Sequence, residues 1–184
     1  MDHQAPGKNV VELLRLIRHD WLNHIQVIKG YISMGRFDRV EEMLNQIVSD
    51  LEQESRLSNL NVPRLAELFL TYNWTRPKVP LKYQVEKTGI FKDNMDGSLT
   101  VWFENFFRLL DKAVSDDWEQ TLKVVITNKK DLPYFYVDFF GELDDGEELF
   151  KFLQEAHEEW KIFHLKKDRG SLSFSIQFHP VKND

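Results

Sequence analysis

The sequence of 184 residues contains no cysteine. This absence excludes disulfide bonds, thiolate nucleophiles and zinc sites built on cysteine, and it is consistent with a reducing compartment. No stretch approaches the roughly 18 apolar residues that a membrane span requires. The first residues also lack the basic and then apolar pattern of a signal peptide. We therefore expect a cytoplasmic protein.

Basic residues are the minority among the charges, with 24 Lys and Arg against 30 Asp and Glu and a net charge of -6. This balance opposes non-specific attraction to nucleic acid or to anionic lipid. Apolar residues make up 42% of the chain, as in ordinary globular proteins. We expect the partner to be another protein, and neither nucleic acid nor a membrane.

Phenylalanine is scarce in the first 60 residues, which hold only Phe37 of the 14 in the chain. The change predicts two parts that pack differently, a domain over residues 1–60 and another over residues 61–184. In the first part, apolar residues recur every three or four positions and predict a helix from about Asn9 to Met34. A second stripe that starts at Val40 predicts a helix to about Ser58.

The residues between these helices predict a tight turn at residues 35–37. Gly35 suits the position just past a helix end, and Asp38 with Glu41 forms a capping-box pattern. Two helices with one apolar stripe each cannot bury both stripes against one another. Pairing of two such hairpins into a four-helix bundle would complete the burial. The alternative is that the stripes pack onto the second domain of the same chain.

The second part mixes helices with strands. Pro63 suits the first position of a short helix that continues to Trp74. Further helices are expected at residues 99–114 and 147–158, and a polar turn at residues 128–131. Strands are predicted over residues 81–86, 122–127, 134–140, 162–165 and 172–178. The expected fold class is α+β, a helical hairpin followed by a sheet that helices cover on one side.

His19 is the candidate reactive residue. Leu14 marks the centre of the apolar stripe. At about 100° per residue, His19 lies about 140° around the helix from Leu14, so its side chain is expected to point to solvent. His24 lies at the edge of the stripe and is expected to be a half-buried packing residue. The two histidines diverge by about 140° and cannot share a metal ion. No Gly-rich elbow offers a hydrolase oxyanion pocket. An exposed imidazole can accept a group from a docked partner, which favours phosphoryl relay over an ordinary surface role.

Residues 18–24 read Arg-His-Asp-Trp-Leu-Asn-His. This string resembles the H-D-x-x-N phosphoacceptor box of histidine-kinase dimerisation helices. Further strings at residues 28–30, 37–43, 54–60 and 69–74 are similar to the sporulation phosphotransferases of endospore-forming bacteria. The resemblance implies a homodimeric four-helix bundle, followed by an α/β domain that resembles the ATPase domain of histidine kinases.

The nucleotide motifs of that ATPase domain are altered in this sequence. The kinase segment G-N-L-L-D-N-A corresponds to residues 107–113, where Arg108 and Lys112 replace the two asparagines. The kinase loop D-x-G-x-G corresponds to residues 138–142, where Asp138 matches but the close-approach glycines are missing. We therefore expect this domain to serve as a structural support or as a docking surface, and to bind no ATP.

The resemblance implies a phosphorelay phosphotransferase of two-component signalling. His19 would accept a phosphoryl group from the phospho-aspartate of a single-domain response regulator. It would then pass the group to the aspartate of a second regulator, a transcription factor that controls sporulation. The regulator would supply Mg²⁺, and this chain would bind no cofactor or metal. The expected catalytic residues are His19, Asn23, Asp20 and Arg18. The expected partner-docking residues are Arg15, Gln26, Val27, Gly30, Tyr31 and Met34.

Several alternatives remain open at this point. Arg15 and Arg18 could be ordinary solvated bases, and Asp20 could orient the ring or only stabilise the helix surface. A mid-helix glycine costs about 1 kcal/mol relative to alanine, so Gly30 indicates either a close partner or local helix packing. The chain could also be a non-catalytic, kinase-like dimer that binds regulators without being phosphorylated. A third possibility is an authentic autokinase, which micromolar ATP binding with labelling of His19 would reveal.

Overall fold

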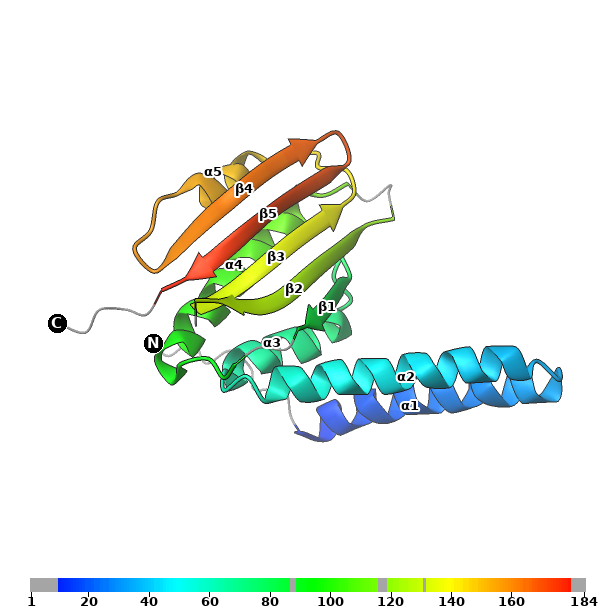
Figure 1. The fold of residues 1–184 in the computed structure, drawn as a ribbon. Helices are drawn as coiled ribbons and strands as arrows, with labels where there is room; N and C mark the ends of the chain where they lie inside the picture. The colour runs from blue at the N-terminus through cyan, green and yellow to red at the C-terminus, as the bar shows by residue number, and fades with distance from the viewer. Residues whose placement is uncertain (1–9, 87–88, 116–118, 131, 180–184) are drawn as a thin grey trace. The chain divides into compact units, whose positions relative to one another are not determined.

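The computed structural model describes residues 10–86, 89–115, 119–130 and 132–179 (Figure 1). The chain divides into two compact units, Met1–Leu51 and Glu52–Asp184. The first unit holds α1 (Val10–Ser33) and most of α2 (Phe37–Ser58), which form the expected hairpin. No helix within the described ranges is long and apolar enough to cross a membrane.

The turn of the hairpin follows from one glycine. Gly35 has a φ of 68°, a left-handed conformation that costs glycine little. The Arg36 N–H donates to the carbonyl of Tyr31 at 2.9 Å, and the Gly35 N–H donates to that of Ile32 at 3.0 Å. These two bonds are the Schellman pattern that terminates helices. The predicted turn is confirmed.

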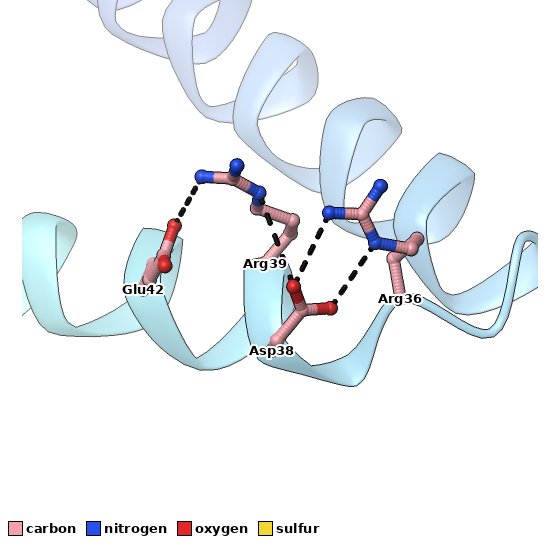
Figure 2. Close-up of polar contacts among 4 residues, drawn as sticks. All are labelled: Arg36, Asp38, Arg39 and Glu42. Carbon is pink, nitrogen blue, oxygen red and sulfur yellow. Dashed lines mark hydrogen bonds and ion pairs between the residues drawn. The ribbon is translucent and has the colours of Figure 1, made fainter.

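The predicted capping box is wrong. α2 begins at Phe37, and the carbonyl of Arg36 accepts its first hydrogen bonds, from the N–H groups of Arg39 and Val40. The Asp38 carboxylate lies inside the first turn, where it accepts from the Arg36 guanidinium at 3.2 and 3.3 Å (Figure 2). This hydrogen bond lowers the pKa of Asp38. The Arg39 guanidinium also pairs with this carboxylate at 4.0 Å, so two arginines that the capping-box pattern does not include bind Asp38 (Figure 2).

Within the described residues, the second unit contains three further α-helices, two short 3-10 helices and five strands. The C-terminal end of α2 also belongs to this unit, and Leu57 of that helix and Leu60 just after it lie in the buried core. The Gln53 side chain also accepts from the Val85 N–H at 2.7 Å. The remaining elements are α3 (Pro63–Tyr72), η1 (Asn73–Thr75), β1 (Leu81–Val85), η2 (Asp93–Met95), α4 (Asp96–Ala113), β2 (Thr121–Lys129), β3 (Leu132–Phe140), α5 (Glu147–Gln154), β4 (Trp160–Asp168) and β5 (Ser171–Phe178).

The strands form one sheet in the order β1-β2-β3-β5-β4. β1 runs parallel to β2, and the other neighbours are antiparallel. α4 and α5 lie against one face of the sheet, so the α+β expectation with one covered face is confirmed (Figure 1). The phenylalanines that the first 60 residues lack build this core: the rings of Trp102 and Phe106 stack at 5.3 Å, and Phe135 is fully buried.

Several elements differ from their expected lengths, and the largest differences are in α5, β2 and β4, which runs over Trp160–Asp168 rather than residues 162–165. α5 ends at Gln154 rather than residue 158, because Glu155 turns into an extended conformation. His157 then stacks on Trp160 with ring centroids 3.5 Å apart, which holds the chain as it enters β4. β2 continues through Lys129, which pairs with Leu132, so the strands occupy much of the expected polar turn. Cross-strand pairing therefore sets the end of β2.

The start of α3 rests on a carboxylate from α4. Asp96, 7% exposed, accepts from the N–H groups of Arg64 and Leu65 at 3.1 and 3.0 Å. Loss of a helix cap costs about 1 to 2 kcal/mol. We expect Asp96→Ala to lower the free energy of unfolding by that amount and Asp96→Asn, which keeps one acceptor, by less. Urea denaturation followed by tryptophan fluorescence measures both. Equal stability of all three proteins would contradict the assignment.

Candidate functional site

His19 lies in the middle of α1, and its side chain is 70% exposed. The predicted outward orientation is confirmed. The Asn23 amide nitrogen lies 3.2 Å from the ring nitrogen Nδ1, because residues four apart share one face of a helix. The Asp20 carboxylate lies 3.6 Å from the same nitrogen. Both neighbours therefore contact Nδ1.

These neighbours bear on which ring nitrogen is nucleophilic. A carboxylate only accepts hydrogen bonds, so Asp20 favours the tautomer with its proton on Nδ1. The Asn23 amide can offer either its nitrogen or, turned by 180°, its oxygen to Nδ1. With the proton on Nδ1, the lone pair is on Nε2. The arrangement can thus present Nε2 of a neutral imidazole to a docked reactant.

The expected docking residues follow His19 along one flank of α1. Their spacing of three and four positions places Arg15, Asn23, Gln26 and Gly30 on the same strip of the helix. Arg15, Arg18, Gln26, Val27 and Met34 are exposed, and Gly30 and Tyr31 are half-buried. His24 is half-buried and meets the Trp21 ring edge to face at 6.1 Å, as expected for a packing residue. The helix therefore places Arg15, Gln26 and Gly30 on the strip that carries His19, and their role in docking stays a prediction.

Gly30 has room for a side chain. A Cβ built at this position meets nothing within 4 Å, so packing within the described part of the chain does not require glycine. This observation favours a close-approaching partner over local packing. We expect Gly30→Ala to raise the free energy of unfolding by about 1 kcal/mol, from the better helix propensity of alanine. The same change should weaken binding of a regulator that docks on this flank.

Gly170→Ala is the matched control, because a Cβ there also meets nothing within 4 Å but lies in the turn between β4 and β5. Thermal unfolding and titration calorimetry with a receiver protein measure the two effects. If Gly30→Ala binds the receiver as tightly as the unchanged chain does, the glycine does not mark a docking surface.

The positions that correspond to the nucleotide motifs are also placed. Lys112 of α4 pairs with Glu148 of α5 at 2.8 Å, and Arg108 is exposed. Asp138 is exposed and lies opposite Lys123 and Ser173, on the sheet face away from α4. β3 continues to Phe140, so the first part of the expected loop at residues 138–142 is strand, and its alternation turns Asp138 outward.

A further D-x-G string, Asp144, Asp145 and Gly146, lies directly before α5. The N–H groups of Asp144 and Asp145 donate to the carbonyl of Ala113 at the end of α4, at 2.8 and 3.2 Å. Gly146 is close to the Phe150 ring, which would lie 2.8 Å from an added Cβ. The fifth position of this string is Glu148, the partner of Lys112.

Comparison with known proteins identifies the family. Residues 3–60 match the family described as "Sensor_kinase_SpoOB-type, alpha-helical domain". Residues 61–179 match "Sporulation initiation phospho-transferase B, C-terminal". The chain belongs to the sporulation initiation phosphotransferase B family. The family resemblance read from the sequence is confirmed, and the chain is a phosphotransferase of two-component signalling in sporulation.

A curated relative extends the match over most of the chain. Sporulation initiation phosphotransferase B of Bacillus subtilis (strain 168) is 37% identical over 166 residues, which are 88% of this chain and 85% of the relative. Among solved structures, the Acinetobacter baumannii histidine kinase AdeS is 14% identical, with a TM-score of 0.40 over 89% of this chain and 98% of that chain. The Erythrobacter litoralis EL346 blue-light activated histidine kinase is 14% identical, with a TM-score of 0.47 over 98% of this chain and 62% of that chain.

Proposed function

We propose that His19 carries the phosphoryl group in a relay between two response regulators. The donor is a single-domain regulator with a phospho-aspartate, and the acceptor is the aspartate of a second regulator, a transcription factor that controls sporulation. The observation that carries the proposal is the 70% exposed imidazole whose contacts lie at Nδ1. Family membership supports phosphoryl transfer as the reaction.

The transfer needs one nucleophile from this chain. The Nε2 lone pair attacks phosphorus in line, the P–O bond to the donor aspartate breaks, and the donor carboxylate leaves with that electron pair. The second aspartate then attacks phosphorus, the P–N bond breaks, and the imidazole is restored. Catalysis of this kind consists mostly of positioning and charge neutralisation. Mg²⁺ belongs to the regulator in this proposal, and the chain binds no cofactor or metal of its own.

The residues around His19 have supporting roles. The Asp20 carboxylate, 3.6 Å from Nδ1, favours a proton there and so leaves the lone pair on Nε2, and the Asn23 amide, turned so that its oxygen accepts from the Nδ1–H, holds the ring plane. Arg18 and Arg15 offset the acidic pocket of the docked regulator. Gln26, Val27, Gly30, Tyr31 and Met34 extend the docking flank along α1. This division separates one catalytic group from the residues that orient it and those that dock the carrier.

We further propose that two hairpins pair into a four-helix bundle. In a single chain, apolar side chains along both helices are left between 43% and 55% exposed: Leu14, Trp21, Ile25 and Ile32 on α1, and Leu44, Val48 and Leu51 on α2. Contiguous exposed apolar surface marks an interaction site. A second copy presents the same rows and so buries both stripes around a two-fold axis. We also propose that residues 61–184 form a kinase-like domain that serves as a structural support or as a docking surface and no longer binds nucleotide.

The deciding experiment mixes the full chain with a phosphorylated receiver domain that carries ³²P. We expect an acid-labile, base-stable label on His19, located by peptide mapping, which chases onto a second receiver on its addition. A receiver that binds without labelling His19 would favour the non-catalytic alternative. Labelling of His19 from ATP alone would instead identify an autokinase.

A further inference from the structure

α4 and α5 lie against one face of the sheet (Figure 1), and the strand register places an ordered set of residues on the opposite face. Residues directly paired across neighbouring strands share one face. The register therefore aligns one row across all five strands, in the order Gln84, Val125, Tyr136, Ser175 and Phe163. Tyr136 lies at the centre of this row, and the two edge strands contribute Gln84 at one end and Phe163 at the other.

Lysines flank the aromatic row on both sides. On one side the register aligns Lys82, Lys123, Asp138, Ser173 and Lys166. On the other side lie Lys129 and Lys161, which share the face with Tyr134. Among the paired strand residues, the acids of this face are Asp138 and Asp168, so that five lysines against two aspartates give a charge of +3. Glu86 and Glu159 continue the same alternation just outside β1 and β4, and they reduce the excess to +1, within a chain whose net charge is -6.

The rings hold the lysines in place. The Lys129 ammonium lies 4.6 Å from the centroid of the Tyr134 ring, and Lys161 lies 5.6 Å from that of Phe163. Tyr134 is only 3% exposed, because Lys129, Tyr136 and Phe163 lie around its ring. Tyr136, by contrast, is 41% exposed. A lysine over a ring keeps its charge at the surface with its stem against apolar carbon. The face therefore combines fixed positive charge with accessible aromatic surface.

We propose that this lysine–tyrosine face, defined by Lys82, Lys123, Lys129, Lys161, Lys166, Tyr134, Tyr136 and Phe163, docks an extended acidic segment of a partner protein. Carboxylates of the segment pair with the lysines of the two flanks. Its apolar side chains lie on the aromatic row between them, on Tyr136 above all, because tyrosine provides much of the binding energy at protein interfaces. The site acts without His19 and goes beyond the phosphoryl relay.

The side chains favour a protein segment over a nucleic acid or a lipid surface. A polyphosphate strand along the first lysine flank would pass over Asp138, which lies in the same row as Lys123 and Lys166, and would meet the repulsion of a chain of net charge -6. Bases would also find Tyr134 already covered. Discrete carboxylates can avoid Asp138, and their attraction is local because salt screens it beyond about 10 Å.

The test measures binding of a fluorescent peptide of 12 residues to the full chain by anisotropy. The peptide alternates glutamate with leucine or phenylalanine, and its control carries lysine in place of glutamate. We expect saturable binding of the acidic peptide that weakens about tenfold between 50 and 300 mM salt, as screening requires. The double variant Lys123→Glu and Lys161→Glu should lose at least tenfold in affinity, and Tyr136→Ala about threefold.

The matched control is the double variant Lys92→Glu and Lys151→Glu, which makes the same charge change at exposed lysines outside the sheet. Circular dichroism establishes that each variant is folded. The proposal is overturned if the acidic peptide does not bind, or if the control variant loses as much affinity as the sheet variant. It is also overturned if a single-stranded RNA of 12 nucleotides or an anionic phosphatidylglycerol vesicle binds this face more tightly than the peptide.

Discussion

The variant His19→Ala should lose phosphoryl passage between regulators by about three orders of magnitude or more, the scale seen on removal of a catalytic nucleophile. Alanine has no lone pair to attack phosphorus, and the structure offers no second exposed histidine within reach on the same flank of α1 in the described residues. Because the ring is exposed and on the surface, the helix should fold as before. Rapid-quench transfer from a ³²P-labelled receiver measures the loss.

Docking separates this prediction from a structural defect. His19→Ala should bind the receiver within about twofold of the unchanged chain, since the docking flank is intact. His24→Ala is the matched control on the same helix, because His24 packs edge to face on Trp21 and contacts no reacting group. Transfer that survives in His19→Ala, or that disappears equally in His24→Ala, would contradict the assignment of His19.

The variant Ile25→Glu should dissociate the proposed dimer. Ile25 is 49% exposed in one chain and lies in the middle of the apolar row of α1. A glutamate there would be buried twice across a two-fold interface, and an unpaired buried charge costs several kcal/mol. We expect the dimer dissociation constant to rise by about a hundredfold or more, which corresponds to roughly 2.7 kcal/mol. Sedimentation velocity over a concentration series measures it.

Val101→Glu provides the control, because Val101 is also exposed, at 56%, but lies on α4 outside the hairpin. It should leave the sedimentation of the chain unchanged. If the unchanged chain and Ile25→Glu sediment alike as monomers at tens of micromolar, the hairpins do not pair and another surface must cover the two apolar rows.

Periodicity predicted the elements that depend on local chemistry. The hairpin turn follows from Gly35, whose positive φ terminates α1 by itself. Pro63 begins α3 because its fixed φ suits the first turn of a helix. The exposure of His19 follows from its angle to Leu14 on one helix. Each of these features depends on residues within one turn of each other, so the sequence is sufficient.

Other features depended on partners far away in the chain. The cap of α3 comes from Asp96, about thirty residues later, and no local pattern marks it. The extension of β4 depends on its pairing with β5, in which Trp160 lies opposite Phe178. The outward orientation of Asp138 depends on the register of β3, which a one-residue shift would reverse.

By itself, then, the sequence determined the order of helices and strands, the position of His19 on an exposed helical surface and the family of the chain, because periodicity and short motifs are local. Only the tertiary structure decided which side of the sheet each strand residue occupies, and so gathered five lysines and three rings on one face. That outcome depends on the pairing of strands separated by up to about forty residues, whose register is set by burial of the opposite face rather than by any local preference.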